Sequence, residues 1–331
     1  MTIQDPNSPP QISIQDIIAL TTFLLIRIPW TIFKTALYRF TGTPNRPPLL
    51  KDLTRSLIRE SFDQVPPAIH NTLPNKTESK TLLSIRYSPL NTHLFHKIQR
   101  PKFTGYWICR GLLPTTPPPM DPKQADIVIY HLRGSGYALG HPGDTLPGLL
   151  FLAEVLEKKG IRDEEKEKKD KDKGEGYPRP GSMILLSPWI DLSLSSPLIP
   201  MLEKRDFLSR AFLQRTGTEL LHSDTRLVSL FGDFTSRSTE RGSWELILPS
   251  RTWVSAGADE IFVDDIERFV NCAREDGVEV ELRVEPGKCH SWQSAEAFLA
   301  ARWFLDMSIK CEGEELMPGL VAVAEVIAGF G

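Results

Sequence analysis

Apolar and polar positions alternate along the second half of the chain in a pattern typical of strands followed by helices. Short β-branched apolar runs predict strands, and apolar residues spaced three or four apart predict helices. The predicted strands cover 127–130, 182–189, 251–257 and 278–287, and the predicted helices cover 145–159, 206–222, 263–277 and 294–310. Strands that alternate with helices predict an α/β fold with a doubly wound, mostly parallel sheet.

The region before the first of these strands has a different composition, rich in proline and polar residues. Two segments with partial alternation, 81–90 and 103–112, predict a hairpin that leads into the main sheet. Later in the chain, the mixed-charge run at 163–176 is typical of a solvated loop. We therefore expect three parts, listed here in chain order: an N-terminal helical cap region at 1–75, the core at 76–311, and a C-terminal tail at 312–331.

The segment "DIIALTTFLLIRIPWTIFKTALYRF" is the most apolar stretch of the chain. Arg27 interrupts it, and a central arginine costs about 2.5–3.5 kcal/mol in a membrane-spanning helix. Trp30 and Lys34 stand beside the apolar positions, as they do in interfacial helices. Three interpretations stay open: a cap helix over a site, an interfacial anchor with peripheral membrane contact between Ile17 and Phe33, and a spanning helix.

Composition and charge narrow the range of functions. The chain has 331 residues, of which 40% are hydrophobic and 24% charged, as in an ordinary globular protein. A formal net charge of −3 gives no basic surface for nucleic acid. The four cysteines form no C-x-x-C pair, and no basic region precedes Asp5 as in a secretory signal. We expect an intracellular protein, cytoplasmic or peripherally membrane-associated, and not a secreted one.

A glycine turn follows the strand predicted at 127–130. Gly134, Ser135 and Gly136 come first and Gly140 follows, a spacing one residue too long for a dinucleotide fingerprint. A P-loop is excluded because no Gly-Lys-Ser/Thr follows the turn. Two interpretations stay open: a structural turn, and a loop whose backbone N–H groups stabilise an oxyanion.

Asp259 and His290 each follow a predicted strand. Taken singly, an acidic residue in this position is typical of a helix cap, and a loop histidine is usually exposed. The carboxyl ends of parallel strands, however, meet at one edge of a sheet and collect functional groups there. Asp followed by His in this order gives the second and third members of an acyl-transfer triad.

Four stretches, "HLRGSGY", "ILLSPWIDLS", "SAGADEIFVDD" and "PGKCHSWQ", give the sequence a family resemblance. It resembles the hormone-sensitive-lipase-like branch of the α/β-hydrolases, in particular the fungal esterase/lipase-like proteins. The resemblance covers 125–310 and, more loosely, the N-terminal region, which would form a cap. It implies hydrolysis of a small carboxylic ester through an acyl-enzyme, without metal or cofactor. Relatives of this kind act in secondary metabolism or in the breakdown of foreign esters.

The resemblance also implies a role for each candidate residue. Backbone N–H groups at Gly134, Ser135 and Gly136 would form the oxyanion hole. His290 would be the general base, and Asp259 would orient it. The oxyanion motif of the family carries a histidine at the place where this sequence has an arginine.

The nucleophile motif G-x-S-x-G is absent from the whole chain. By resemblance, the segment that would carry it, together with a central strand, is missing between about 161 and 167. The strand at 182–189 would then pair directly with that at 127–130, giving a contracted sheet. Three hypotheses follow: an esterase whose sequence has lost an internal segment, a non-catalytic protein that binds an ester or acyl ligand, and an unstable product without function.

Overall fold

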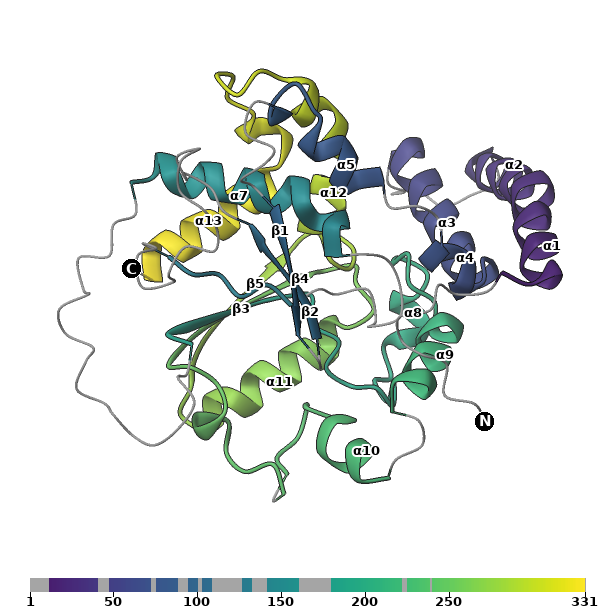
Figure 1. Ribbon diagram of the computed structural model, residues 1–331. Helices are drawn as coiled ribbons and strands as arrows, with labels where there is room; N and C mark the ends of the chain where they lie inside the picture. The colour runs from purple at the N-terminus through teal and green to yellow at the C-terminus, as the bar shows by residue number, and fades with distance from the viewer. Residues whose placement is uncertain are drawn as a thin grey trace.

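The computed structural model describes most of the chain and places a parallel sheet at its centre (Figure 1). The residues it describes are 12–40, 48–72, 76–88, 95–100, 103–108, 127–132, 142–160, 180–221, 225–238 and 240–330.

The central sheet has three parallel strands in the order β3-β4-β5 among the described residues. These are β3 (Ser182–Leu186), β4 (Arg251–Gly257) and β5 (Glu279–Glu285). β4 lies in the middle and is buried from Thr252 onwards, whereas every residue of β3 is half-buried. A middle strand covered on both faces is expected to be apolar throughout, as "TWVSA" nearly is.

The two faces of β4 belong to two separate hydrophobic clusters. Val254 and Ala256 pack in the cluster that contains α11 (Val263–Glu275), and Trp253 packs in the cluster that contains α7 (Leu146–Lys158) and α12 (Trp292–Asp306). Successive side chains of a strand point to opposite faces, which produces this alternation. The predicted α/β arrangement with a parallel sheet is therefore present, with helices on both faces of the sheet (Figure 1).

Outside this central part, helices dominate the N-terminal third of the chain. The elements not yet named are α1 (Ile14–Thr22), the π-helix η1 (Phe23–Arg27), α2 (Ile28–Phe40), α3 (Leu49–Gln64), α4 (Pro67–Thr72), α5 (Lys76–Leu82), β1 (Phe95–Arg100), β2 (Phe103–Ile108), η4 (Pro142–Thr145), α8 (Ile199–Leu202), α9 (Arg210–Leu221), α10 (Thr225–Phe231), η5 (Trp244–Leu246), η6 (Glu314–Leu316) and α13 (Pro318–Phe330). The predicted helical character of the N-terminal region agrees with α1 to α4.

Two predicted strands are wrong. The segment 81–90 begins as the end of α5 and continues as turns as far as 88, and β2 pairs with β1 instead. The residues of 127–132 are exposed and form no regular structure. A strand forms only where a partner offers a hydrogen-bonding edge. No such partner reaches 127–132 among the described residues, so the expected pairing with β3 is not found there.

The end of the chain is a packed helix rather than a tail. α13 lies against α7 and α12, and Leu320, Val323 and Ala324 are buried in the cluster they form. The run "GLVAVAEVIAGF" is apolar on most sides, as expected of a helix that packs against two others.

We expect Val323→Ala to lower the free energy of unfolding by about 2 kcal/mol, because it removes two buried methyl groups and leaves a cavity. Val228→Ala is the matched control, since Val228 also lies in a helix but is 46% exposed. Urea unfolding followed by circular dichroism measures both variants. Equal losses in the two variants would contradict the packed position of α13.

Candidate functional site

The carboxyl ends of the three parallel strands converge on one cluster of polar side chains. Ser187 directly follows β3, Glu260 lies in the turn after β4, and His290 lies in the loop after β5. Gly257 allows this approach, because a Cβ atom there would lie 2.2 Å from the backbone oxygen of Lys288. The backbone N–H of Asp259 donates to that same oxygen at 2.9 Å, so the two loops are held together.

Glu260 is the carboxylate that faces His290. Its side chain is fully buried, and its Oε1 lies 3.7 Å from Nδ1 of His290. Neither of these two atoms has a hydrogen-bond partner among the described residues. The other oxygen, Oε2, accepts hydrogen bonds from the Ser187 hydroxyl at 2.7 Å and from the Gly257 N–H at 2.6 Å. The carboxylate is therefore fixed through one oxygen and leaves the other for the imidazole.

The surroundings of His290 favour its charged form. Burial alone would lower the pKa of this histidine, but the carboxylates of Glu260 and Asp206 outweigh burial and raise it above its ordinary value. The rings of Phe207 and Phe262 stand edge-on to the imidazole, with centroids 5.9 and 5.3 Å away. A base with an apolar surround and one oriented carboxylate is suited to taking up a proton.

Asp206 is a second buried carboxylate in the cluster. It accepts hydrogen bonds from the backbone N–H groups of Ile261 at 2.7 Å, Phe207 at 2.6 Å and His290 at 3.3 Å. Burial raises the pKa of Asp206, although the charge of His290 and these N–H groups act in the opposite direction. Asp206 thus ties the loop before α9 to both loops of the site.

Backbone strain is concentrated at the same place. Ser187 and Ser291 have φ angles of +48° and +47°, in the left-handed region that residues with a Cβ rarely adopt. The Ser291 N–H donates to the Ser187 hydroxyl at 2.9 Å, which in turn donates to Glu260. Strained residues of this kind persist where surrounding contacts enforce them, often at functional sites.

The structure directs the side chain of Asp259, the residue predicted to orient His290, away from the imidazole. Asp259 points towards Arg205, with 3.6 Å between its Oδ1 and Nη1, and its side chain is 30% exposed. The turn after β4 directs the next side chain, that of Glu260, inward to His290. Two adjacent carboxylates in "ADEIF" cannot be told apart by strand position alone, and the geometry of the turn determines which of them faces His290.

The predicted oxyanion residues Gly134, Ser135 and Gly136 lie outside the described residues, as does the charged run 163–176. Sequence reasoning did not single out Glu260, Asp206 or Ser187, whose contacts with His290 and with one another come from segments far apart in the chain. Within the described ranges, no group of three His, Cys, Asp or Glu side chains is placed to hold a metal ion.

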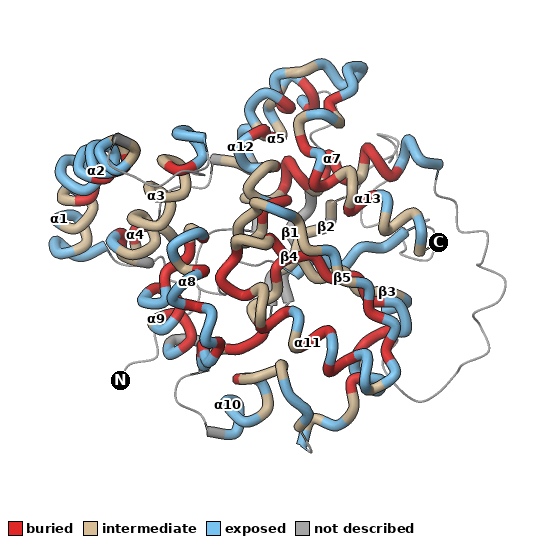
Figure 2. Tube along the Cα trace, turned by 180° about the vertical axis from the view of Figure 1, so that it is seen from behind, coloured by how far each residue is buried: buried red, intermediate tan, exposed pale blue. Residues whose placement is uncertain are grey.

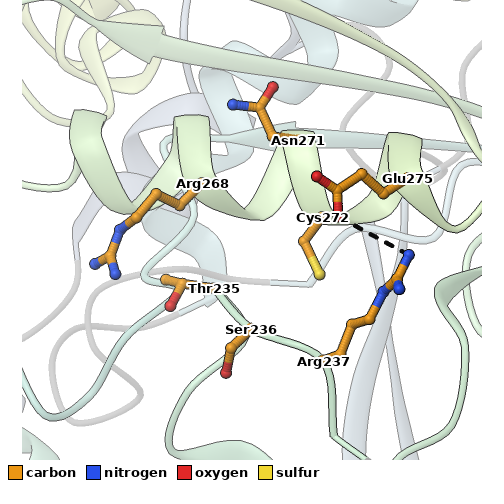
Figure 3. A pocket seen from close by; sticks show the side chains of 7 residues that line it. All are labelled: Thr235, Ser236, Arg237, Arg268, Asn271, Cys272 and Glu275. Carbon is orange, nitrogen blue, oxygen red and sulfur yellow. Dashed lines mark ion pairs between the residues drawn. The ribbon is translucent and has the colours of Figure 1, made fainter.

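A surface hollow of about 420 Å³ lies elsewhere, beside α11 (Figure 3). Its lining consists of polar and charged side chains and one cysteine: Thr235, Ser236, Arg237, Arg268, Asn271, Cys272 and Glu275. Arg237 pairs with Glu275 at 3.9 Å and with Asp276 at 2.9 Å, and Arg268 pairs with Asp265. Because both cations are already neutralised by carboxylates, we assign no ligand to this hollow.

Comparison with solved structures shows that the fold of this chain is a known one. An esterase from the bacterial hormone-sensitive lipase family matches 97% of this chain and 100% of its own, at 15% identity and a TM-score of 0.51. The fold is that of an α/β-hydrolase. In hydrolases of this fold the triad members follow one another along the chain as Ser, then Asp or Glu, then His. Among its described residues, the chain has three parallel strands of such a sheet.

Two other solved structures match less closely. A hormone-sensitive lipase from a metagenome library is 21% identical over 56% of this chain and 51% of its own length, with a TM-score of 0.36. The chain thus spans about half the length of that lipase. The structure of EstE5 matches 91% of this chain and 98% of its own, at 15% identity and a TM-score of 0.48. No protein-family model and no curated protein sequence matches the chain.

Proposed function

We propose that this chain carries the acid–base half of a carboxylic-ester hydrolase site, with His290 as the base and Glu260 as the carboxylate that orients it. The observation that supports this proposal is the buried Glu260 carboxylate facing Nδ1 of His290 at 3.7 Å, at the ends of adjacent parallel strands. In the proposed site the carboxylate holds the imidazole in one tautomer and stabilises the imidazolium that forms.

In a complete site of this type, the histidine takes the proton of a serine hydroxyl and later gives it to the leaving alcohol. Here the sequence has no G-x-S-x-G motif. Ser187 is not a substitute, because its hydroxyl donates to Glu260 and its side chain is 3% exposed. We therefore propose that the chain, with this sequence, does not form an acyl-enzyme.

We expect that any hydrolysis of p-nitrophenyl butyrate by the purified protein does not depend on His290. Without an attacking serine, any remaining effect comes from binding and an oxyanion hole, about 10³–10⁴ over water in the serine proteases. Rates for the wild type and His290→Ala should agree within about twofold, which is less than 0.5 kcal/mol of transition-state stabilisation. A fluorophosphonate probe should leave no covalent adduct by mass spectrometry.

Turnover that disappears in His290→Ala, or a stoichiometric adduct on a serine, would contradict the proposal that the chain forms no acyl-enzyme. Sequencing the transcript across 161–173 addresses the origin of the gap separately. An in-frame insert with G-x-S-x-G would mean that the longer product is the esterase and that this chain lacks its serine.

A second candidate function is the binding of a small ester or acyl ligand without turnover. The observation that favours it is that Glu260 faces His290 in a chain without a G-x-S-x-G motif. Short-chain carboxylic esters and acids should then raise the thermal transition of the wild type in a concentration-dependent way. The same compounds should have no effect on a His290→Ala/Glu260→Ala variant that keeps a cooperative transition. No shift in the wild type would rule out this second function while leaving the acid–base geometry untouched.

A further inference from the structure

α1, η1 and α2 form one continuous helix whose apolar side faces outward. It runs over 26 residues from Ile14 to Arg39, long and apolar enough by composition to cross a membrane. Its length is about 39 Å. Figure 2 shows most of α1 and α2 in the colour of exposed residues. Among the large apolar side chains, Ile14 is 77% exposed, Leu25 72%, Ile26 61%, Trp30 55% and Phe33 55%.

The inner side of this helix is the more polar one over its second half. Thr31 and Thr35 are buried there at 6% and 8% exposure, and Arg39 pairs with Asp52 of α3 at 3.9 Å. Phe23 is the only residue of the first half that is buried, and it packs against Val65 and Ile69. A helix on the surface of a globular protein in water has the opposite arrangement, with its apolar stripe facing the core.

The exposed apolar surface is too wide for a single partner helix. Leu24, Leu25 and Ile26 are consecutive and 50%, 72% and 61% exposed. Three consecutive residues cover about half the circumference of a helix. The stripe that pairs two helices is a narrower seam of positions three and four apart. The width of the apolar surface therefore favours a continuous apolar medium over a second copy of this chain.

The charges on the helix are of the kind that an anionic surface attracts. Arg27 and Lys34 carry positive charge on the exposed part of the helix, whereas Arg39 is paired with Asp52. The single acid of the helix, Asp16, is engaged in a capping box with Ser13. Lys34 lies over the ring of Tyr38 at 5.7 Å from its centroid, and Trp30 contacts Phe33 at 5.8 Å between centroids. Aromatic and basic residues that occur together are typical of helices at a membrane–water interface.

We propose that the helix from Ile14 to Arg39 lies in the plane of an anionic lipid bilayer, with its outward apolar face among the acyl chains. It lies on the membrane and does not span it, because α3 and α4 occupy its inner side along its length. Arg27 stands in the middle of the helix, where its long side chain reaches the headgroups only in an in-plane orientation. α3 lies between this helix and the Glu260–His290 pair, because it packs on α2 and because its Arg55 and Arg59 donate to the backbone oxygens of Arg205 and Asp206.

Flotation of the full chain with phosphatidylcholine vesicles, with and without about one-third phosphatidylserine, tests the proposal. We expect binding to the anionic vesicles. Leu25→Gln/Phe33→Gln should weaken it at least tenfold, because each side chain loses most of its apolar transfer energy. The matched control is Leu246→Gln/Phe298→Gln, which changes the same residue types at sites 63% and 71% exposed and should bind as the wild type does. Removing the charge of Lys34 should weaken binding to the anionic vesicles about fivefold.

Three results would overturn the proposal. The first is an absence of vesicle binding by wild-type protein with a cooperative thermal transition. The second is a dimer in light scattering that Leu25→Gln/Phe33→Gln dissociates, which would mean that a second copy covers this face. The third is resistance of the bound protein to extraction by alkaline carbonate, which would mean that the helix spans the bilayer. None of these results bears on the acid–base pair, so the two proposals can fail independently.

Discussion

Replacing Glu260 by glutamine is expected to lower the pKa of His290, whereas Asp259→Asn leaves that pKa close to its wild-type value. In the wild type, burial lowers the pKa of His290 and the carboxylates of Glu260 and Asp206 raise it by a larger amount. Glu260→Gln removes the stronger of these two opposing charges while burial remains. Asp259 is directed to Arg205 and not to the imidazole, so it serves as the matched control.

The same replacement should change stability with a defined pH dependence. A histidine whose pKa is raised on folding stabilises the protein fully below its ordinary pKa of 6.5, and this stabilisation is lost as pH rises through the raised value. Glu260→Gln should abolish most of that dependence. It should also cost about 1.5–3 kcal/mol, because the Ser187 hydroxyl and the Gly257 N–H lose a charged acceptor.

Proton NMR titration of the seven histidines, with His290 assigned from a His290→Gln spectrum, measures the pKa. Urea unfolding at several pH values measures the stability. A larger fall of the pKa in Asp259→Asn than in Glu260→Gln would return the role of the acid to Asp259. An unchanged pKa in both variants would show that neither carboxylate governs the base.

The sequence was sufficient for the three strands of the central sheet and for the helices α11 and α12. β4, α11 and β5 lie within a residue or two of the predicted 251–257, 263–277 and 278–287. These segments are strongly periodic, and their local preference agrees with their place in the core. α12 also begins within two residues of its predicted start.

Prediction failed where tertiary contacts overrule the local pattern. The alternation in "TLLSIRYSPL" favours a strand, but Tyr87 and Arg86 are drawn into a buried polar cluster with Glu154 of α7, which a turn can supply and a strand cannot. The β-branched run at 127–130 has strand character but no neighbouring strand among the described residues. The sequence could not indicate this, because pairing depends on which segments are present beside it.

The site could be predicted to the level of a loop but not to that of an atom. The pattern of strands and polar residues predicted that Asp259 and His290 lie in the loops after two neighbouring strands, and the structure has them after β4 and β5. The choice between Asp259 and Glu260 depends on the turn after β4, where the Gly257 N–H and the Ser187 hydroxyl capture Oε2 of the second carboxylate. Contacts between segments more than seventy residues apart leave no local signal.

Replacing Glu154 by glutamine is expected to cause the largest loss of stability of any single change considered, about 3–5 kcal/mol. Arg86 is 2% exposed, and its Nε and Nη2 donate to the two oxygens of Glu154 at 3.1 and 2.5 Å. The Tyr87 hydroxyl donates to the same carboxylate at 2.5 Å. The neutral amide would leave a buried guanidinium without a counter-charge, which is costly in a low-dielectric interior.

The position of this pair explains why its loss should affect the whole fold. Arg86 also donates to the backbone oxygens of Ser308 at 2.8 Å and Cys311 at 3.2 Å, and its guanidinium stacks 4.3 Å from the ring centroid of Phe304. One side chain thus joins the turn after α5, the helix α7 and the chain that follows α12. Removing its counter-charge should loosen all three attachments.

Glu157→Gln is the control for Glu154→Gln, since Glu157 lies one turn further along α7 and is exposed. Its effect should stay within about 0.5 kcal/mol in the same urea unfolding experiment. The double replacement Arg86→Met/Glu154→Leu should recover a large part of the loss, because apolar residues of similar volume can replace a buried ion pair at little cost. If Glu154→Gln and Glu157→Gln are equally mild, the buried pair does not hold the three segments together. If the double variant is no more stable than Glu154→Gln, the loss reflects packing at this point and not an unpaired charge.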